Sequence, residues 1–201
     1  MNRRLVLVRH GTTAWLEKGL IQGASESDLT QRGVRESELT AAALRHIPFD
    51  AAFCSPMARA RQTAAILCAP HGLETVIIPQ LHEMDFGCYE DKPFFEAPEP
   101  GDGPLNRFGL LGRILLAQLT GEMLWHVRRR ARAALASIHA LQPEGTLLVV
   151  AHGVILNYLL QELLGTRTSF HLQPCSISEV QIDNGRVNAL RTNDTVHLTP
   201  A

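Results

Sequence analysis

The sequence lacks the short patterns that typically bind a metal ion. It has nine histidines and four cysteines, but no His-x-His, His-Glu-x-x-His or Cys-x-x-Cys. The four cysteines are far apart from one another along the chain: Cys54, Cys68, Cys88 and Cys175. We therefore expect reduced, mostly buried thiols, and a reaction that needs neither a metal ion nor another cofactor.

The chain also has little excess charge and no long apolar run. Its formal net charge is -1, which gives no whole-molecule reason to bind nucleic acid or an anionic membrane. The apolar run at 5–8 is interrupted by Arg9 and His10, so it is too short for a signal-peptide core or a membrane span. We expect a cytoplasmic protein that binds a small molecule; a homodimer is left open.

The alternation of short apolar runs with amphipathic segments predicts an α/β fold. The chain has 201 residues, of which 45% are hydrophobic, and this suits one domain over 1–201. Runs at 5–8, 51–54, 75–78 and 146–151 predict buried strands. The segments 177–182 and 187–191 predict a hairpin through Asp183-Asn184-Gly185. We expect a three-layer sandwich with a mainly parallel central sheet flanked by helices.

Four helices are predicted between and after these strands. Thr30 is an expected N-cap for a helix that ends before Pro48 and buries Val34, Ala41 and Leu44, with Ser37 small enough to join them. Ser55 is an expected N-cap for a helix over 56–68. The other two helices span 124–141, with Leu124 and Leu141 in the apolar pattern, and 154–164, closed by Gly165.

Two further segments lie outside the helices and strands, and one helix carries a cluster of charge. Residues 81–87 predict a loop, and residues 92–120, rich in proline and glycine at first, predict an insertion of loop plus one short helix. The remaining surface of the helix over 124–141 carries an arginine cluster, Arg128, Arg129, Arg130 and Arg132. Such a cluster usually lies on a solvated helix face, which is the interpretation we adopt.

Two His-Gly pairs follow two predicted strands. His10-Gly11 ends the first strand and His152-Gly153 ends the strand at 146–151. Ligands bind outside the carboxyl ends of strands in open α/β sheets, so both imidazoles are expected in one site. Arg59, near the start of its helix, and Arg9 beside His10 favour an anion, with a phosphate as the obvious candidate.

Each of these residues has an ordinary structural interpretation when taken alone. A single histidine at a strand end is most often a hydrogen-bonded core residue. Arg59 alone would be interpreted as a helix-surface residue. Glu83, a further candidate in the predicted loop at 81–87, would alone be interpreted as a solvated carboxylate. The convergence of all of them at one edge of a sheet favours a catalytic site instead.

The motifs that carry these residues resemble the histidine phosphatase superfamily, the phosphoglycerate mutase-like proteins. They occur in the family's order along nearly the whole chain: Leu7-Val8-Arg9-His10-Gly11-Thr12-Thr13-Ala14-Trp15, Leu29-Thr30-Gln31-Arg32-Gly33, Ser55-Pro56-Met57-Ala58-Arg59-Ala60-Arg61-Gln62-Thr63-Ala64, Glu83-Met84-Asp85-Phe86-Gly87 and Ala151-His152-Gly153. The resemblance implies that His10 is a nucleophile that becomes phosphohistidine. It implies that Arg9, Arg59 and His152 hold the phosphoryl oxygens, and that Glu83 is the proton donor.

The resemblance also predicts substrate contacts and shows two departures. The expected substrate-binding residues, besides Arg9 and Arg59, are Gly11, Thr12, Gln22, Gly23 and Gly153. Thr12 stands where many members carry Glu, and Leu16 stands where many carry Asn. One polar contact is therefore either missing or supplied by another residue.

Three other functions compete with phosphomonoester hydrolysis by a broad-specificity or α-ribazole phosphatase-like enzyme. A phosphoglycerate mutase is the first, although the short middle segment favours the phosphatase branch with a partly apolar pocket. A cysteine-dependent phosphatase would need arginine six positions after its nucleophile, but Arg59 follows Cys54 by five and glycines are missing. A non-enzymatic phospho-ligand binding protein is the third.

Overall fold

The computed structural model describes residues 2–93 and 121–199. Six strands form one sheet in the order β3-β2-β4-β1-β5-β6. The strands are β1 (Asn2–Arg9), β2 (Ala51–Cys54), β3 (Thr75–Ile77), β4 (Gly145–Ala151), β5 (Ile177–Asp183) and β6 (Arg186–Asp194). The helices are α1 (Ala14–Glu17), α2 (Gln31–Leu44), α3 (Ala58–Cys68), α5 (Leu124–Leu141) and α6 (Gly153–Leu164).

Strand pairing in the sheet changes from parallel to antiparallel at β1. β1 pairs parallel with β4, and β4 continues through β2 to β3 with parallel pairing. On its other side β1 pairs antiparallel with β5, which forms the expected hairpin with β6. The strands β1, β2 and β4 have almost wholly buried central residues because helices cover both faces.

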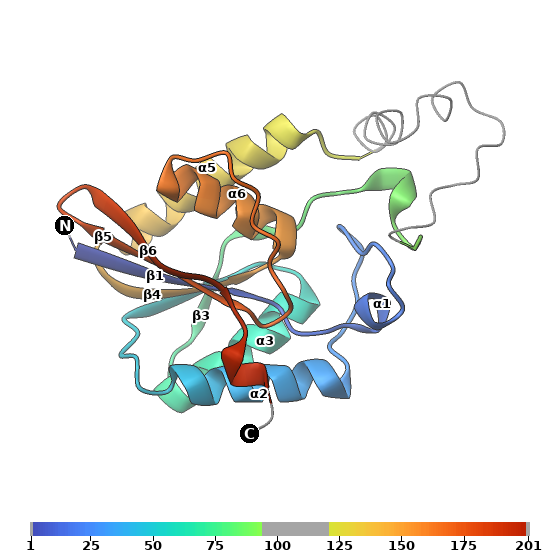
Figure 1. Ribbon diagram of the computed structural model, residues 1–201, viewed down its shortest axis with the longest axis horizontal. Helices are drawn as coiled ribbons and strands as arrows, with labels where there is room; N and C mark the ends of the chain where they lie inside the picture. Colours follow the sequence, from blue (N-terminus) through green and yellow to red (C-terminus); the bar gives the residue numbers. More distant parts are fainter. Residues whose placement is uncertain (1, 94–120, 200–201) are drawn as a thin grey trace.

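The helices form a layer on each face of this sheet (Figure 1). One face packs α5 and α6 against Leu5, Leu7 and Val149, in a core that also includes Ile138 and Leu156. The opposite face packs α2 and α3 against alternate strand residues, among them Val6, Val8 and Val150. The predicted three-layer α/β sandwich is confirmed, and each face has its own core.

Several predicted element boundaries agree with the structure. Thr30 caps α2, since its side chain accepts a hydrogen bond from the Gly33 backbone N–H. α6 ends at Leu164, before Gly165. The β5–β6 turn contains Asn184 and Gly185, both with positive φ, as a two-residue hairpin loop requires.

Other expectations about the helices were wrong. Val34 is 37% exposed, because the buried face of α2 is made by smaller residues, Gly33, Ser37, Thr40 and Ala41, together with Leu44. Leu124 and Leu141, at the two ends of α5, are 40% and 57% exposed. Helix α1, capped by Thr13, was not predicted. Most of the expected insertion, 94–120, lies outside the described residues.

The loop at 81–87 is confirmed, with a 3-10 turn before it (Pro79–Leu81) and another at its end (Gly87–Tyr89). Further 3-10 turns lie at Ala69–His71 and Val196–Leu198. Within the described ranges, no helix is both long and apolar enough to span a membrane.

Candidate active site

Strand register brings the two His-Gly pairs together. Arg9 at the end of β1 is paired with Ala151 at the end of β4, and the His10 backbone N–H donates to the Ala151 carbonyl at 2.9 Å. The next residue on each strand is therefore a histidine. The His10 and His152 rings lie 5.0 Å apart between centroids, in an edge-to-face arrangement. The expectation that both imidazoles reach one place is confirmed.

The surroundings of His10 favour a neutral ring with a free nitrogen. Its Nδ1 lies 2.8 Å from the carbonyl oxygen of Gly11. A carbonyl only accepts, so Nδ1 carries the hydrogen and Nε2 keeps a lone pair. Burial lowers the pKa of His10 well below its usual 6.5, and the positive charges of Arg9 and Arg59 lower it further. The buried ring is thus neutral rather than cationic, and its Nε2 has the lone pair that a nucleophile requires.

His152 has both ring nitrogens engaged by protein groups. Arg59 Nε donates to His152 Nδ1 at 3.1 Å, and His152 Nε2 lies 2.7 Å from Ser55 Oγ. Because Nδ1 accepts, Nε2 carries the hydrogen and donates to the hydroxyl. Burial, followed by the charge of Arg59, lowers the pKa of His152 well below 6.5. A neutral His152 therefore holds Arg59 by accepting from its Nε.

The prediction that Ser55 caps α3 was wrong. The N-cap is Met57, which makes no side-chain capping bond. Instead, the Glu26 carboxylate accepts from the Ala58 backbone N–H at 3.0 Å, while Ser55 bonds His152. Ser55 Oγ also accepts from the Met57 backbone N–H at 3.3 Å, but this bond lies before α3, which begins only at Ala58.

The guanidinium of Arg59 is held by the loop that follows α1. Its Nη2 donates to the Gly23 carbonyl at 2.7 Å and its Nη1 to the Ser25 carbonyl at 2.8 Å. Glu90 fixes this loop, since its carboxylate accepts from the backbone N–H groups of Ala24 and Ser25. Burial lowers the pKa of Arg59 to about 10, so the side chain is still cationic at neutral pH.

Two buried donors at the site have no hydrogen-bond partner among the described residues: Arg9 Nε and Gln22 Nε2. Arg9 is fixed by its Nη1, which donates to the Leu172 carbonyl at 2.5 Å. Gln22 is fixed by its Oε1, which accepts from Thr13 Oγ1 at 3.0 Å. Unpaired buried donors are costly, and oxygen atoms of an anionic ligand would satisfy both.

Glu83 is positioned by the N-terminus of α6. The first N–H groups of a helix lack intrahelical partners, and the N-cap residue, His152, makes no side-chain capping bond. Glu83 replaces that cap: its Oε2 accepts from Val154 N–H at 3.0 Å, and its Oε1 accepts from Ile155 and Met84 N–H. Oε1 thus accepts two hydrogen bonds and Oε2 accepts one, so Oε2 keeps the lone pair that can hold a proton.

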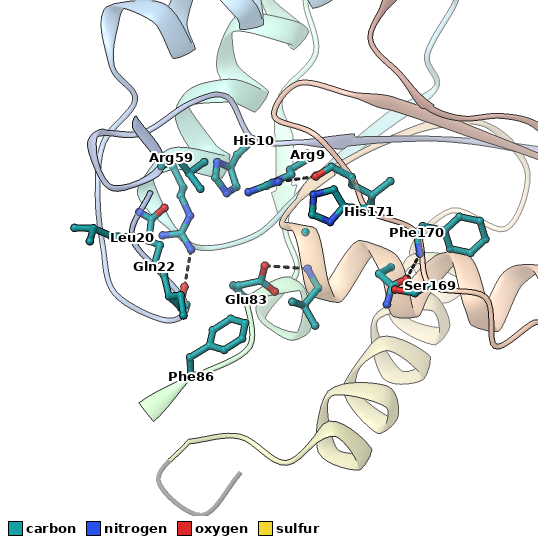
Figure 2. A pocket seen from close by; sticks show the side chains of 17 residues that line it. Arg9, His10, Leu20, Gln22, Arg59, Glu83, Phe86, Ser169, Phe170 and His171 are labelled. Carbon is teal, nitrogen blue, oxygen red and sulfur yellow. Dashed lines mark hydrogen bonds between the residues drawn. The ribbon is translucent and has the colours of Figure 1, made fainter. Parts of the chain in front are cut away.

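These side chains surround a cavity of about 360 Å³ (Figure 2). Of the predicted site residues, the cavity is lined by Arg9, His10, Gln22, Gly23, Arg59, Glu83 and Gly153. His152 lies behind His10 and is fully buried. The remaining lining is largely apolar: Leu16, Leu20, Ile21, Phe86, Val154, Phe170 and Leu172, with Asn157, Ser169 and His171.

Gly11 and Thr12 do not line the cavity but contact the helices α3 and α2. The Gly11 N–H donates to Thr63 Oγ1 at 3.1 Å, and the Thr12 N–H donates to the Glu36 carboxylate at 3.0 Å. A Cβ on Gly33 would lie 2.0 Å from the Thr12 carbonyl oxygen. These two residues join the end of β1 to α2 and α3; a direct contact with substrate stays a prediction.

The segment 169–172 was not predicted to be part of the site. These residues follow α6 without a charge cluster or a motif, yet they form one wall of the cavity. The Phe170 N–H donates to Asn157 Oδ1 at 2.7 Å, which ties the wall to α6. In the sequence, the one signal for this wall was the asparagine Asn157 within the apolar pattern of a helix.

Among the described ranges, no three His, Cys, Asp or Glu side chains are grouped so that they could hold a metal ion.

Comparison with known proteins agrees with this geometry. The family model described as "Histidine phosphatase superfamily (branch 1)" matches residues 5–195. The chain belongs to the histidine phosphatase superfamily. The chain is similar to a Yersinia pestis protein named "Probable phosphoglycerate mutase GpmB". The two are 33% identical over 181 residues, which cover 88% of this chain and 84% of that one.

Solved structures share the superfamily fold. The α-ribazole phosphatase from Shigella flexneri has a TM-score of 0.78 at 26% identity, with 96% of each chain covered. A phosphoglycerate mutase from Bacillus anthracis has a TM-score of 0.79 at 22% identity, covering 98% of this chain and 95% of that one. Histidine phosphatase superfamily proteins of similar fold thus include both phosphatases and mutases.

Proposed function

We propose that this chain is a metal-independent phosphomonoester hydrolase that acts through a phosphohistidine intermediate on a small phosphorylated metabolite. The observation that carries the proposal is the neutral His10 ring at the cavity wall, with two guanidinium groups beside it and the Glu83 carboxyl group on the same cavity. Figure 2 shows these side chains arriving from separate segments of the chain.

In the first proposed step, the lone pair of His10 Nε2 attacks phosphorus and the bond from phosphorus to the ester oxygen breaks. The leaving oxygen takes the proton from Glu83 Oε2, so an alcohol departs instead of an alkoxide. Arg9 Nε and Gln22 Nε2 donate to the phosphoryl oxygens, and Arg59 adds positive charge. No metal ion is needed in this scheme, because guanidinium groups meet the phosphoryl charge and a carboxylic acid supplies the proton.

In the second step, water attacks the phosphohistidine and the bond from phosphorus to nitrogen breaks. Glu83, now a carboxylate, accepts a proton from the attacking water, and inorganic phosphate is released. His10 returns to its neutral form with Nδ1 still donating to the Gly11 carbonyl. One carboxyl group thus serves as acid and then as base.

The apolar lining supports hydrolysis of an ester with an apolar leaving group. Beyond Arg9, His10 and Arg59, the described lining offers His171 as its one further basic side chain, so a second anionic group on the substrate would have few partners. Leu16, Leu20 and Phe86 instead favour aromatic or alkyl surface. The similarity to the Shigella flexneri α-ribazole phosphatase agrees with this choice.

A phosphoglycerate mutase is the alternative, favoured by the name of the Yersinia pestis relative. A panel of phosphate esters decides between the two. It includes 1-naphthyl phosphate, α-ribazole phosphate and 3-phosphoglycerate, each assayed for free phosphate, and the last also for isomerisation. We expect phosphate release from the apolar esters to be the faster reaction. Isomerisation that outpaces every hydrolysis would overturn the proposal.

The role of His10 is tested by trapping the intermediate. Alkaline quenching during turnover of a ³²P-labelled ester should leave acid-labile label on the wild-type protein and none on His10→Ala. The variant should lose at least about 10³-fold in kcat, with an unchanged circular dichroism spectrum. Turnover retained by His10→Ala would remove this residue from its assigned role, and binding of phosphate without turnover by the wild type would indicate a non-enzymatic function.

A further inference from the structure

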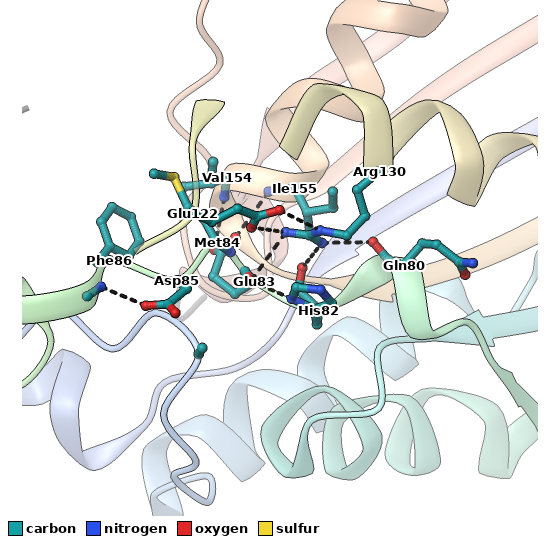
Figure 3. A network of polar contacts seen from close by, with 12 residues as sticks. Gln80, His82, Glu83, Met84, Asp85, Phe86, Glu122, Arg130, Val154 and Ile155 are labelled. Atoms are coloured by element: carbon teal, nitrogen blue, oxygen red, sulfur yellow. Dashed lines mark hydrogen bonds and ion pairs between the residues drawn. The ribbon is translucent and has the colours of Figure 1, made fainter. Parts of the chain in front are cut away.

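One arginine of the predicted solvated cluster on α5 does not face solvent. The Arg130 side chain is only 11% exposed and reaches the loop that carries Glu83 (Figure 3). Its Nη1 donates to the carbonyls of Gln80 at 2.9 Å and His82 at 2.5 Å. Its Nη2 lies 3.4 Å from the Glu83 carbonyl. The expectation of a wholly solvated arginine face was wrong for this residue, because Arg130 donates to three backbone carbonyls of the neighbouring loop.

A carboxylate fixes the orientation of this guanidinium. Glu122 accepts from Arg130 Nε at 3.0 Å and from Nη2 at 2.5 Å, in the two-point geometry that sets the plane of an arginine. The Glu122 backbone also contacts the loop directly, since its N–H donates to the Asp85 carbonyl at 2.8 Å. The Glu122 side chain is itself only 15% exposed. The loop is thus held at four carbonyls by two residues.

We propose that Arg130, oriented by Glu122, is a positioning residue for the proton donor Glu83. The inference rests on the proposed function, in which Glu83 protonates the leaving oxygen. The carboxylate of Glu83 is held by α6, and its backbone is held by Arg130 on α5. Without the second restraint the carboxyl group still has its partners on α6, but the loop behind it can shift relative to the phosphoryl site.

The other arginines of the cluster make a different set of contacts. Arg128 and Arg132 both pair with Glu162 on α6, and no hydrogen bond from either reaches residues 80–85. The Arg132 side chain is 64% exposed. Arg132→Gln therefore removes an arginine from the same helix without touching the Glu83 loop, and it is the matched control.

The expected effect depends on the leaving group. A displacement of about 1 Å at a catalytic group can cost about 10²-fold in rate. We expect Arg130→Gln to reduce kcat on ethyl phosphate, a poor leaving group, by about 30-fold. The same variant should lose no more than about threefold on p-nitrophenyl phosphate, whose leaving group needs little protonation. Arg132→Gln should leave both rates unchanged.

A double-mutant cycle separates positioning from general destabilisation. In a Glu83→Gln background, Arg130→Gln should cause no further leaving-group-dependent loss, because the acid through which it acts is gone. If Arg130→Gln does not fold, Glu122→Gln provides the same test, since the amide keeps one hydrogen bond to Arg130 and loses the charge. Its loss should follow the same leaving-group pattern with a smaller size, about fivefold on ethyl phosphate.

The outcomes distinguish this inference from the function on which it rests. Losses by Arg130→Gln or Glu122→Gln that are equal for both esters, or that persist undiminished in the Glu83→Gln background, would overturn the positioning role. If Glu83→Gln itself shows no leaving-group dependence, the proposed role of Glu83 fails first. A selective loss in Glu83→Gln that neither Arg130→Gln nor Glu122→Gln shares refutes only the inference.

Discussion

Replacing Gly33 by alanine tests the contact between α2 and Thr12, which lies just after the end of β1. Alanine is intrinsically better than glycine inside a helix by about 1 kcal/mol, so local propensity alone predicts stabilisation. The structure predicts the opposite. A Cβ at this position would lie 2.0 Å from the Thr12 carbonyl oxygen and 2.8 Å from the Thr12 nitrogen. Both are backbone atoms, which cannot turn aside as a flexible side chain can.

The size of the effect follows from the distance that must open. Ordinary contact begins at 3.4 Å, so the carbonyl must retreat by roughly 1.4 Å, the difference between 3.4 and 2.0 Å. That carbonyl accepts from the Thr30 N–H at 3.0 Å. Overpacking costs about 1–3 kcal/mol and the weakened hydrogen bond about 1 kcal/mol more. After subtraction of the helix-propensity gain, we expect about 2 kcal/mol of destabilisation.

Urea unfolding and thermal melting measure this prediction directly. A loss of about 2 kcal/mol corresponds to a fall in Tm of about 4–8 °C for a chain of this size. Because Thr12 lies two residues after His10, kcat on p-nitrophenyl phosphate should also fall about tenfold. Arg35→Ala, at an exposed position of the same helix, should stay within about 0.5 kcal/mol of wild type. A Gly33→Ala protein that is more stable than wild type and fully active would refute the reasoning.

Three other predictions concern the site itself. The free energy of unfolding should fall as pH drops from 7.5 to 5.5, because the pKa values of His10 and His152 are well below 6.5 when folded. In this range the two histidines bind protons in the unfolded chain but not in the folded chain, which lowers the free energy of unfolding by up to about 1.4 kcal/mol per pH unit for each histidine. Urea titrations at several pH values should show that the unfolding free energy of His10→Gln depends less steeply on pH than that of the wild type. An identical pH dependence contradicts the assignment. Gly23→Ala should raise KM and lower Tm, since its φ is +54° and a Cβ would lie 2.1 Å from Glu90 Oε1; wild-type kinetics would show that this loop is not needed to hold the site. Leu16→Asn should lower kcat/KM for 1-naphthyl phosphate about tenfold relative to ethyl phosphate, and an unchanged ratio would remove Leu16 from the leaving-group pocket.

Much of the fold and of the site was predictable because its signals are local. A short apolar run that ends in His-Gly marks a buried strand whose next residue emerges at the sheet edge, as His10 does after β1. Thr30 caps α2, and Asn184 with Gly185 turns the hairpin, through contacts within a few residues of the chain. The family resemblance of five ordered motifs then agreed with the match of the family model over residues 5–195.

The predictions that failed depended on partners far away in the sequence. Ser55 has the local features of a helix cap, but α3 begins only at Ala58, whose backbone N–H donates to the carboxylate of the distant Glu26 at 3.0 Å. Val34 fits the apolar period of α2, but the close approach of Thr12 to Gly33 leaves room only for small residues at the start of the buried face. A helical wheel cannot show how near the neighbouring backbone lies.

The sequence by itself determined the order of strands and helices, the two histidines at strand ends and the cationic residues beside them, since residue type and spacing encode these features. Only the tertiary structure decided that Arg130 grips the Glu83 loop, that Glu83 caps α6, and that residues 169–172 form a wall of the cavity. The physical reason is that unpaired backbone groups at loops and helix ends bond to whichever side chains packing brings near, and that proximity is set by the assembled sheet and its helices.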